Sequence, residues 1–272
     1  MEQRRTLSRR GLLALGTIGL VSACSSTKAT SRLPVPTAGG ATSTPPTLST
    51  TPPTKAGWAQ LRRHIDGQLA RPGSTAYDVA RLVENPRYDA NRPLAVLTAA
   101  SSADVATAIS FAQDHAIPVA IRSGGHSYPG WSAGGGAGTG VPRSLVIDCR
   151  DLDSVSVNGT HATIGAGAAL APVYDAVASK GRAIAGGSCA TVGIGGLTLG
   201  GGVGVLTRAM GLTCDAVRSM RVVTANGKTL TADATNHPDC TGRCAAEAAD
   251  TSGWSRRSRS RPSRPRRSTP ST

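Results

Sequence analysis

Two glycine-rich stretches constrain this 272-residue chain more than any other feature of its sequence. The first, residues 122–127, reads RSGGHS, and the second, residues 186–204, reads GGSCATVGIGGLTLGGGVG. Glycine has no Cβ, so its backbone turns tightly and can touch a phosphate-bearing ligand directly. Each stretch also carries one nucleophilic side chain, His126 or Cys189. The two stretches therefore predict a site that holds a phosphorylated ligand and tethers it.

Neither stretch matches the best-known phosphate-binding loops. In a P-loop, four residues separate a first glycine from Gly-Lys-Ser/Thr, and Val222 stands at the place of that first glycine before Gly227-Lys228-Thr229. A dinucleotide fingerprint beginning at Gly193 would need a third glycine at 198, where threonine stands. A merely flexible loop is disfavoured, because apolar residues recur throughout the second stretch. These are Val192, Ile194, Leu197, Leu199, Val203, Val205 and Leu206.

The net charge of +14 suggests a nucleic-acid partner, but the position of the charge argues against one. Seven arginines lie in the last 17 residues, which contain no acidic residue, and four more lie in the first 23. Nucleic-acid surfaces combine basic with aromatic side chains on a folded face, and only 3% of this chain is aromatic. We therefore predict no nucleic-acid partner.

Residues 1–23 are predicted to be a twin-arginine-like lipoprotein signal peptide. Ser8-Arg9-Arg10 precedes a short apolar run, and residues 21–24 read VSAC, a lipobox-like sequence. Cys24 would then be lipidated, leaving an exported protein anchored on the outer face of the cytoplasmic membrane. A plain signal peptide with an incidental cysteine, and hence a secreted protein, is the alternative. Residues 24–56, rich in Ser, Thr and Pro, are predicted to form a disordered stalk.

The folded part alternates helical and strand patterns, with a helical lead-in at 57–90 and a domain at 91–239. The predicted helices are 58–69, 75–82, 101–115, 170–180 and 203–210. The predicted strands are 119–122, 144–148, 154–157, 161–165, 221–225 and 228–231, with hairpins at Asn158-Gly159 and Asn226-Gly227. Because several strands pair through tight turns, we expect an α+β fold.

These motifs resemble the FAD-linked oxidases of the vanillyl-alcohol oxidase type, and most closely the berberine-bridge-enzyme-like branch. The resemblance rests on RSGGHS at 122–127, GSCATVGIGG at 187–196, and GGGVG at 200–204 followed by GLTCD at 211–215. It implies a PCMH-type FAD-binding domain of two α/β subdomains. The substrate domain that family members carry further downstream is missing from this sequence.

The resemblance implies FAD as the cofactor, bonded twice. His126 would bond to the flavin C8α methyl and Cys189 to flavin C6. Backbone N–H groups at 123–126 would hold the pyrophosphate, while Arg122 either orients the loop or offsets phosphate charge. The cofactor-binding residues are predicted to be Arg122, Ser123, Gly124, Gly125, His126, Ser127, Gly187, Ser188, Cys189, Thr191, Val192, Gly193, Gly195, Gly196, Gly200 and Val223.

The sequence departs from the family in two ways. Leu197 stands where the family often has histidine, and Ala190 where it often has proline. The larger departure follows His237-Pro238-Asp239, where the resemblance stops. One base restored after the Asp239 codon gives, with GC-rich codons, a reading DLYWALRGGGGGHFGV that is close to the family's next motif. We therefore interpret 240–272 as a disordered, frameshifted tail.

A frameshifted tail also makes its cysteines poor evidence for a metal site. Cys240 and Cys244 have no second ligand pair, so we predict no metal site. The function expected is that of an FAD-dependent oxidoreductase, which moves hydride from an alcohol- or sugar-like substrate to flavin and is reoxidised by dioxygen or another acceptor. No catalytic base can be named in this chain. The alternatives are a non-catalytic surface lipoprotein and a non-covalent FAD reductase of cell-wall synthesis.

Overall fold

The computed structural model describes residues 53–136, 141–238, 240 and 253–260. The predicted signal peptide, Cys24 and most of the predicted stalk lie outside these residues. Among the described residues, no helix is long and apolar enough to cross a membrane.

The helices are α2 Lys55–Arg63, α3 Thr75–Ala80, α4 Ser102–Asp114, α5 Leu170–Ala178, α6 Ile194–Leu199 and α7 Thr207–Met210, with 3-10 turns at Pro86–Tyr88, Trp131–Ala133 and Cys214–Ala216. The strands are β1 Gln68–Ala70, β2 Ala95–Thr98, β3 Val119–Arg122, β4 Leu145–Asp148, β5 Val155–Asn158, β6 His161–Gly165, β7 Val217–Thr224, β8 Thr229–Asp233 and β9 Gly253–Ser260.

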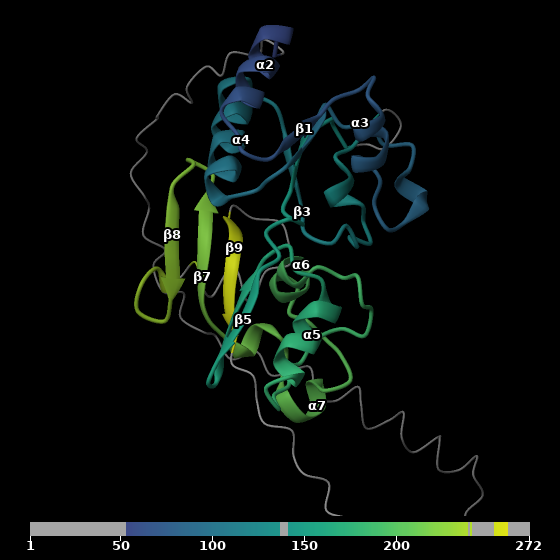
Figure 1. Cartoon of the computed structure of the whole chain (residues 1–272). Coiled ribbons are helices and arrows are strands. Elements are labelled where there is room, and N and C mark those ends of the chain that lie inside the picture. The colour runs from purple at the N-terminus through teal and green to yellow at the C-terminus, as the bar shows by residue number, and fades with distance from the viewer. Residues whose placement is uncertain (1–52, 137–140, 239, 241–252, 261–272) are drawn as a thin grey trace, which may run out of the picture. The chain divides into compact units, whose positions relative to one another are not determined.

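The first sheet has the strand order β1-β2-β4-β3, with β2, β4 and β3 parallel and β1 antiparallel at one edge. Successive side chains of a strand point to opposite faces. Leu97 and Ile147 accordingly join a core with α2 and α4, whereas Val96 and Val146 belong to a separate cluster that packs against Ala80 of α3. The continuous apolar runs of β2 and β4 reflect this burial on both faces. Figure 1 shows α4 on one side of β1 and β3 and α3 on the other.

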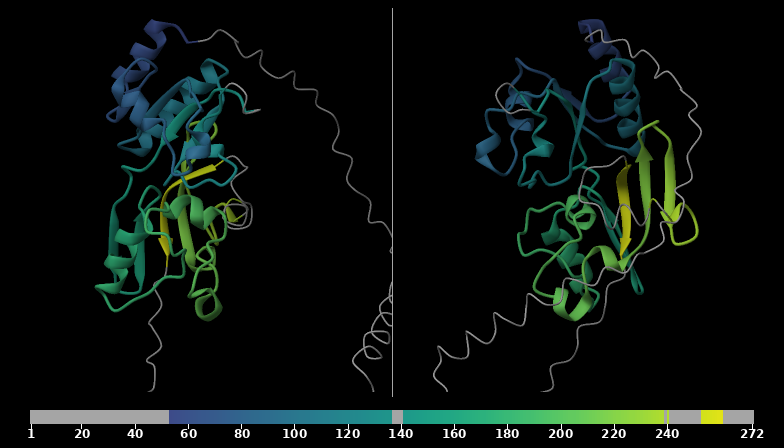
Figure 2. Two further views of the ribbon diagram at one scale, coloured as in Figure 1. Left: turned by 90° about the vertical axis from the view of Figure 1, so that its right-hand side faces the viewer. Right: turned by 180° about the vertical axis from the view of Figure 1, so that it is seen from behind.

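The second sheet is antiparallel, with the order β5-β6-β9-β7-β8. Its hairpins turn at Asn158-Gly159 and Asn226-Gly227, as predicted, and both glycines have positive φ. A second core joins Ile164 of β6 to α5 and to Ile194 of α6. Figure 2 shows from two more sides that β7, β8 and β9 run alongside one another.

A buried carboxylate joins the lead-in to the first sheet. Asp104 lies in the first turn of α4 and is 2% exposed. Its two oxygens accept hydrogen bonds from the backbone N–H groups of Asp66, Gly67 and Ala100 at 2.8–3.0 Å. Satisfying three otherwise orphaned donors stabilises the turn that leads into β1. The segment 57–90 is therefore part of the first subdomain and contains a strand, which the sequence did not predict.

The predicted α+β fold of two subdomains is confirmed, but several elements differ from prediction. The sequence did not predict strand β2, and the helix predicted at 58–69 ends at Arg63, with strand β1 following it. The helix predicted at 203–210 begins only at Thr207, since Gly201 and Gly202 just upstream have positive φ. Helix α6 arises inside the second glycine stretch, where the glycines hid the helical pattern. Strand β9 lies within the tail predicted to be disordered, because extended backbone there pairs with both β6 and β7. The rest of 241–272 lies outside the described residues.

Candidate functional site

Arg122 ends β3, and its guanidinium is wholly buried. It forms an ion pair with Asp148 at the end of β4, with 3.3 Å between Nη1 and Oδ2. It also donates hydrogen bonds to the backbone carbonyls of Ala80, Leu82 and Ser132 at 2.5, 3.4 and 3.1 Å. Burial lowers the pKa of Arg122, and the Asp148 carboxylate opposes that shift. All these partners belong to the protein, so of the two predicted roles the structure shows the one that orients the loop.

The two glycine stretches meet backbone to backbone. A Cβ on Gly124 would clash with the amide nitrogen of Gly193, and a Cβ on Gly193 would clash with the hydroxyl of Ser123. Ser123 Oγ in turn donates a 2.6 Å hydrogen bond to the carbonyl of Ala166, just after β6. The absence of a side chain at Gly124 and Gly193 therefore lets the loop after β3 lie directly on the loop before α6.

This contact brings the predicted attachment residues together. Nε2 of His126 lies 2.9 Å from Oγ1 of Thr191, and Sγ of Cys189 lies 3.7 Å from the same oxygen. A carboxylate oxygen of Glu84 lies 3.9 Å from His126 Nε2. His126, 65 positions before Thr191 in sequence, thus shares the hydroxyl group of Thr191 with Cys189. The Cys189 side chain is exposed, and the imidazole side chain of His126 is 19% exposed.

The backbone of the first loop retains unused donors. In the part of the chain that the structure describes, no backbone hydrogen bond has Ser123, Gly124, Gly125 or His126 as its donor. Gly125 has a φ of 77°, the left-handed conformation that turns successive N–H groups toward one concave face. Such a group of free N–H donors fits a phosphate or pyrophosphate anion. The site therefore suits the FAD that the sequence predicts.

The second loop is braced by the start of α5. Backbone N–H groups of Leu170 and Ala171 donate to the carbonyls of Val192 and Ala190, both at 3.0 Å. The hydroxyl of Tyr174 donates to the carbonyl of Gly187 at 2.5 Å. A Cβ on Gly195 would lie 2.6 Å from the carbonyl oxygen of Ala166. These contacts hold the segment around Cys189 against α5 and β6.

The other predicted residues occupy different environments. Ser188, Gly196 and Gly200 are exposed, and a Cβ on Gly196 would meet nothing within 4 Å. Ser127 accepts a hydrogen bond from the backbone N–H of Trp131. Val223 is 1% exposed within the first hydrophobic core, so only its backbone could face a ligand.

Sequence reasoning missed two members of this arrangement. Asp148 is recognisable only as the acid that ends a predicted strand, and its pairing with Arg122 depends on the parallel alignment of β3 and β4. Glu84 belongs to a segment with no motif, although its backbone N–H donates to the carbonyl of Gly125 at 3.3 Å. No local pattern could have placed either residue.

Two other cysteines differ sharply from Cys189. Cys149 and Cys214 are buried. Burial, with a contribution from Asp148, raises the pKa of the Cys149 thiol to about 12. Burial and Asp215 also raise the pKa of Cys214. Neither thiol is suited to nucleophilic chemistry near neutral pH, because the thiolate is the reactive form.

Comparison with known proteins agrees with this geometry. The model of the FAD binding domain family matches residues 93–233. An uncharacterised FAD-linked oxidoreductase, YgaK of Bacillus subtilis, is 36% identical over 181 residues, which are 64% of this chain and 38% of YgaK. The structure of BBE-like 1 from Physcomitrella patens superposes with a TM-score of 0.70 at 32% identity, covering 76% of this chain and 44% of that protein.

Glucooligosaccharide oxidase from Acremonium strictum, described as having a 6-S-cysteinyl, 8α-N1-histidyl FAD, superposes with a TM-score of 0.69 at 25% identity. That match covers 76% of this chain and 42% of the oxidase. The chain thus spans less than half the length of the relatives that it matches.

The fold and the paired glycine loops define a PCMH-type FAD-binding module of the kind found in flavin-linked oxidoreductases. The chain belongs to the FAD binding domain family, and its relatives include berberine-bridge-enzyme-like and vanillyl-alcohol-oxidase-type flavoprotein oxidases.

Proposed function

We propose that this chain is the FAD-binding portion of an exported FAD-dependent oxidoreductase and holds its flavin through both His126 and Cys189. The observation that carries the proposal is the convergence of these two side chains on the Thr191 hydroxyl, at 2.9 and 3.7 Å. Two nucleophiles from separate loops are then close enough to reach one flavin ring system. The relative with a cysteinyl and histidyl FAD supports the same arrangement.

Each side chain has an atom available for such a bond. When Nε2–H of His126 donates to Thr191, Nδ1 keeps its lone pair and is the nitrogen left to react. The Cys189 thiol is exposed, so a ligand in the loop can reach it. Each bond would replace one C–H of the flavin and one N–H or S–H of the protein. Each bond formed would therefore release two electrons and two protons, and one dioxygen molecule per bond would take them up as hydrogen peroxide.

The rest of the loop would hold the diphosphate. The free N–H groups of residues 123–126 are donors, and the buried pair Arg122–Asp148 keeps the loop in place. Bound FAD would supply hydride acceptance, for which an alcohol- or sugar-like substrate is the proposed donor and dioxygen the proposed acceptor. Sugar chemistry is favoured by the oligosaccharide oxidase among the similar structures. We assign no catalytic base in this chain, so turnover by this chain alone is not part of the proposal.

Mass spectrometry of the purified full chain tests the attachment directly. After denaturation and proteolysis, we expect the peptide containing His126 and the peptide containing Cys189 to be joined through one FAD. His126→Ala and Cys189→Ala should each keep covalent flavin through the remaining bond, and the double variant should lose it. A folded, colourless wild-type protein that takes up no FAD would instead favour a non-catalytic surface lipoprotein. FAD that washes out on denaturation would favour non-covalent binding.

Export is the second part of the proposal, and it rests on sequence alone. Ser8-Arg9-Arg10 and the lipobox-like VSAC at 21–24 motivate it. Intact-mass analysis of protein from the native host should show a chain that begins at a diacylated Cys24. A mass that includes Met1 would contradict both lipidation and cleavage.

A further inference from the structure

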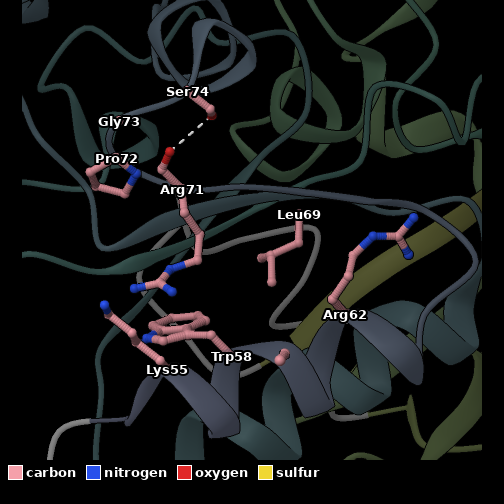
Figure 3. A pocket seen from close by; sticks show the side chains of 9 residues that line it. Lys55, Trp58, Arg62, Leu69, Arg71, Pro72, Gly73 and Ser74 are labelled. Atoms are coloured by element: carbon pink, nitrogen blue, oxygen red, sulfur yellow. Dashed lines mark hydrogen bonds between the residues drawn. The ribbon is translucent and has the colours of Figure 1, made fainter.

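A cavity lies in the lead-in, away from the glycine loops in sequence. It has a volume of about 370 Å³ and is formed by α2, β1 and the turn that precedes α3 (Figure 3). Its lining residues are Lys55, Trp58, Ala59, Arg62, Leu69, Arg71, Pro72, Gly73 and Ser74. The proposed flavin site uses none of these residues.

The charged side chains that line this cavity are all cationic. Lys55, Arg62 and Arg71 line it, and no acidic residue does. Of the ion pairs found among the described residues, none includes any of the three. In the same part of the chain, Nε of Arg71 is buried and has no hydrogen-bond partner. A buried N–H without an acceptor is costly, and it shows that the protein leaves part of the hydrogen-bonding capacity of the Arg71 guanidinium unused.

The position of Arg71 is set before any ligand arrives. Its guanidinium carbon lies 5.0 Å from the ring centroid of Trp58, which is 4% exposed and packs against Phe111. The Ser74 hydroxyl donates a 2.9 Å hydrogen bond to the carbonyl of Arg71, and Gly73 allows the turn between them with a φ of 94°. Lys55 lines the same cavity as this stacked pair (Figure 3). Less side-chain freedom is therefore lost on binding.

Helix α2 adds a second reason to expect an anion. Lys55 is its first residue, and the first turn contains no acidic side chain. A cation at the positive end of the helix dipole is unfavourable, and a bound anion would offset both charges. A guanidinium and an ammonium together suit the oxygens of a phosphate group, the first as a planar fork and the second as a point charge.

We propose that this cavity is a binding site for a phosphate monoester group, held by Arg71 and Lys55 with Arg62 at its rim. The group could belong to a soluble phosphate ester or to a lipid headgroup, since both present the same oxygens. Leu69 and the aliphatic parts of the cationic side chains also line the cavity and offer apolar surface to an organic substituent beside the phosphate.

Calorimetric titration of the full chain with glycerol 3-phosphate at low ionic strength tests the proposal. We expect saturable binding with one site, weakened at least fivefold in Arg71→Gln and in Lys55→Gln. Arg63→Gln is the matched control, because it removes the same charge from α2 but does not line the cavity. It should change the affinity less than twofold. Lys55 is exposed, so its variant remains informative if Arg71→Gln fails to fold.

The result that would overturn the proposal is an absence of saturable binding, or an equal loss in Arg63→Gln, which would mean attraction by net charge alone. Co-sedimentation with phosphatidylcholine vesicles containing phosphatidic acid separates the two sources. Arg71-dependent binding to these vesicles, and not to pure phosphatidylcholine, would identify a lipid headgroup. Arg71-dependent binding of the soluble ester alone would identify a free phosphate ester.

Discussion

Arg122 and Asp148 form an ion pair whose two side chains are 0% and 1% exposed, at the adjacent ends of β3 and β4. Nη1 of the arginine lies 3.3 Å from a carboxylate oxygen that Arg150 also contacts, at 2.7 Å. Arg122 is also the first residue of the glycine stretch 122–127. It therefore couples the stability of the first sheet to the geometry of the proposed flavin site.

Breaking this pair should destabilise the protein strongly. Asp148→Asn leaves the buried Arg122 guanidinium without its counter-charge, and Arg122→Met leaves the carbonyls of Ala80 and Ser132 without their donor. Removing one partner of a buried pair costs about 3–5 kcal/mol, so we expect losses of that size in urea unfolding. The exposed half of the network supplies the control: Arg150→Met should cost less than about 1 kcal/mol. Equal losses in all three variants would contradict this account.

The contact between the glycine loops predicts opposite effects for two Gly→Ala changes. Gly193→Ala would push its methyl into the Ser123 hydroxyl and the Gly124 backbone, which are held by other contacts. Overpacking of this kind costs about 1–3 kcal/mol, and FAD uptake should fall with the separation of the loops. Gly196→Ala meets open space in α6 and should be neutral or slightly stabilising. Thermal unfolding of both variants checks the difference in stability, and flavin absorbance of Gly193→Ala checks the loss of FAD uptake.

Thr191 should position His126 and Cys189 for attachment. Thr191→Val keeps the shape but removes the shared hydroxyl, whereas Thr191→Ser retains it. A lost hydrogen bond is worth about 1 kcal/mol, so covalent FAD should form about fivefold more slowly in the valine variant. Flavin fluorescence of the chain on denaturing gels, sampled over time, measures this rate. Identical rates for valine, serine and wild type would remove Thr191 from the mechanism.

The cysteines should differ in reactivity before flavin is attached. At pH 8, iodoacetamide should modify the exposed Cys189 and leave Cys149 intact, because burial raises the pKa of Cys149 to about 12. Peptide mapping locates the modified residue. The same experiment on flavin-loaded protein should leave Cys189 unmodified. Modification of Cys189 in the loaded protein would count against the cysteinyl bond.

Stability should decline in the alkaline range. The Cys149 thiol has a folded-state pKa of about 12, above the value of about 8.5 for an unfolded chain. Its contribution is therefore complete below about pH 8.5 and is lost as the pH rises toward 12. Cys149→Ala should reduce the slope of unfolding free energy against pH in this window by up to about 1.4 kcal/mol per pH unit. A slope equal to that of wild type would contradict the burial of the thiol.

Strands β3 and β4 of the first sheet and the two hairpins of the second could be predicted from local pattern, whereas β1 and β2 were missed. The apolar run at 145–148 and the Asn-Gly turns at 158 and 226 depend on neighbours in sequence, and the structure confirms them. Helix α6 could not be predicted, because its helical face is interrupted by Gly195 and Gly196. Nor could β9, since its partners β6 and β7 come from distant parts of the chain.

The candidate site likewise combines residues that the sequence identifies with a role that only the structure decides. Its glycines, His126 and Cys189 stand out in the sequence because the backbone chemistry of phosphate binding restricts which residues can serve. The sequence left two roles open for Arg122, orienting the loop or offsetting phosphate charge, because the sequence does not show whether this arginine is buried or exposed. Burial against the end of α3 decided between the two roles.

The sequence by itself determined the kind of ligand, because tight turns without side chains and two nucleophiles are local properties of residues 122–127 and 186–204. Tertiary structure alone decided that these nucleophiles meet at one hydroxyl, that a buried ion pair supports the first loop, and that three cations surround a separate cavity. Those relationships depend on contacts between residues tens of positions apart, which only the packed sheets and helices bring together.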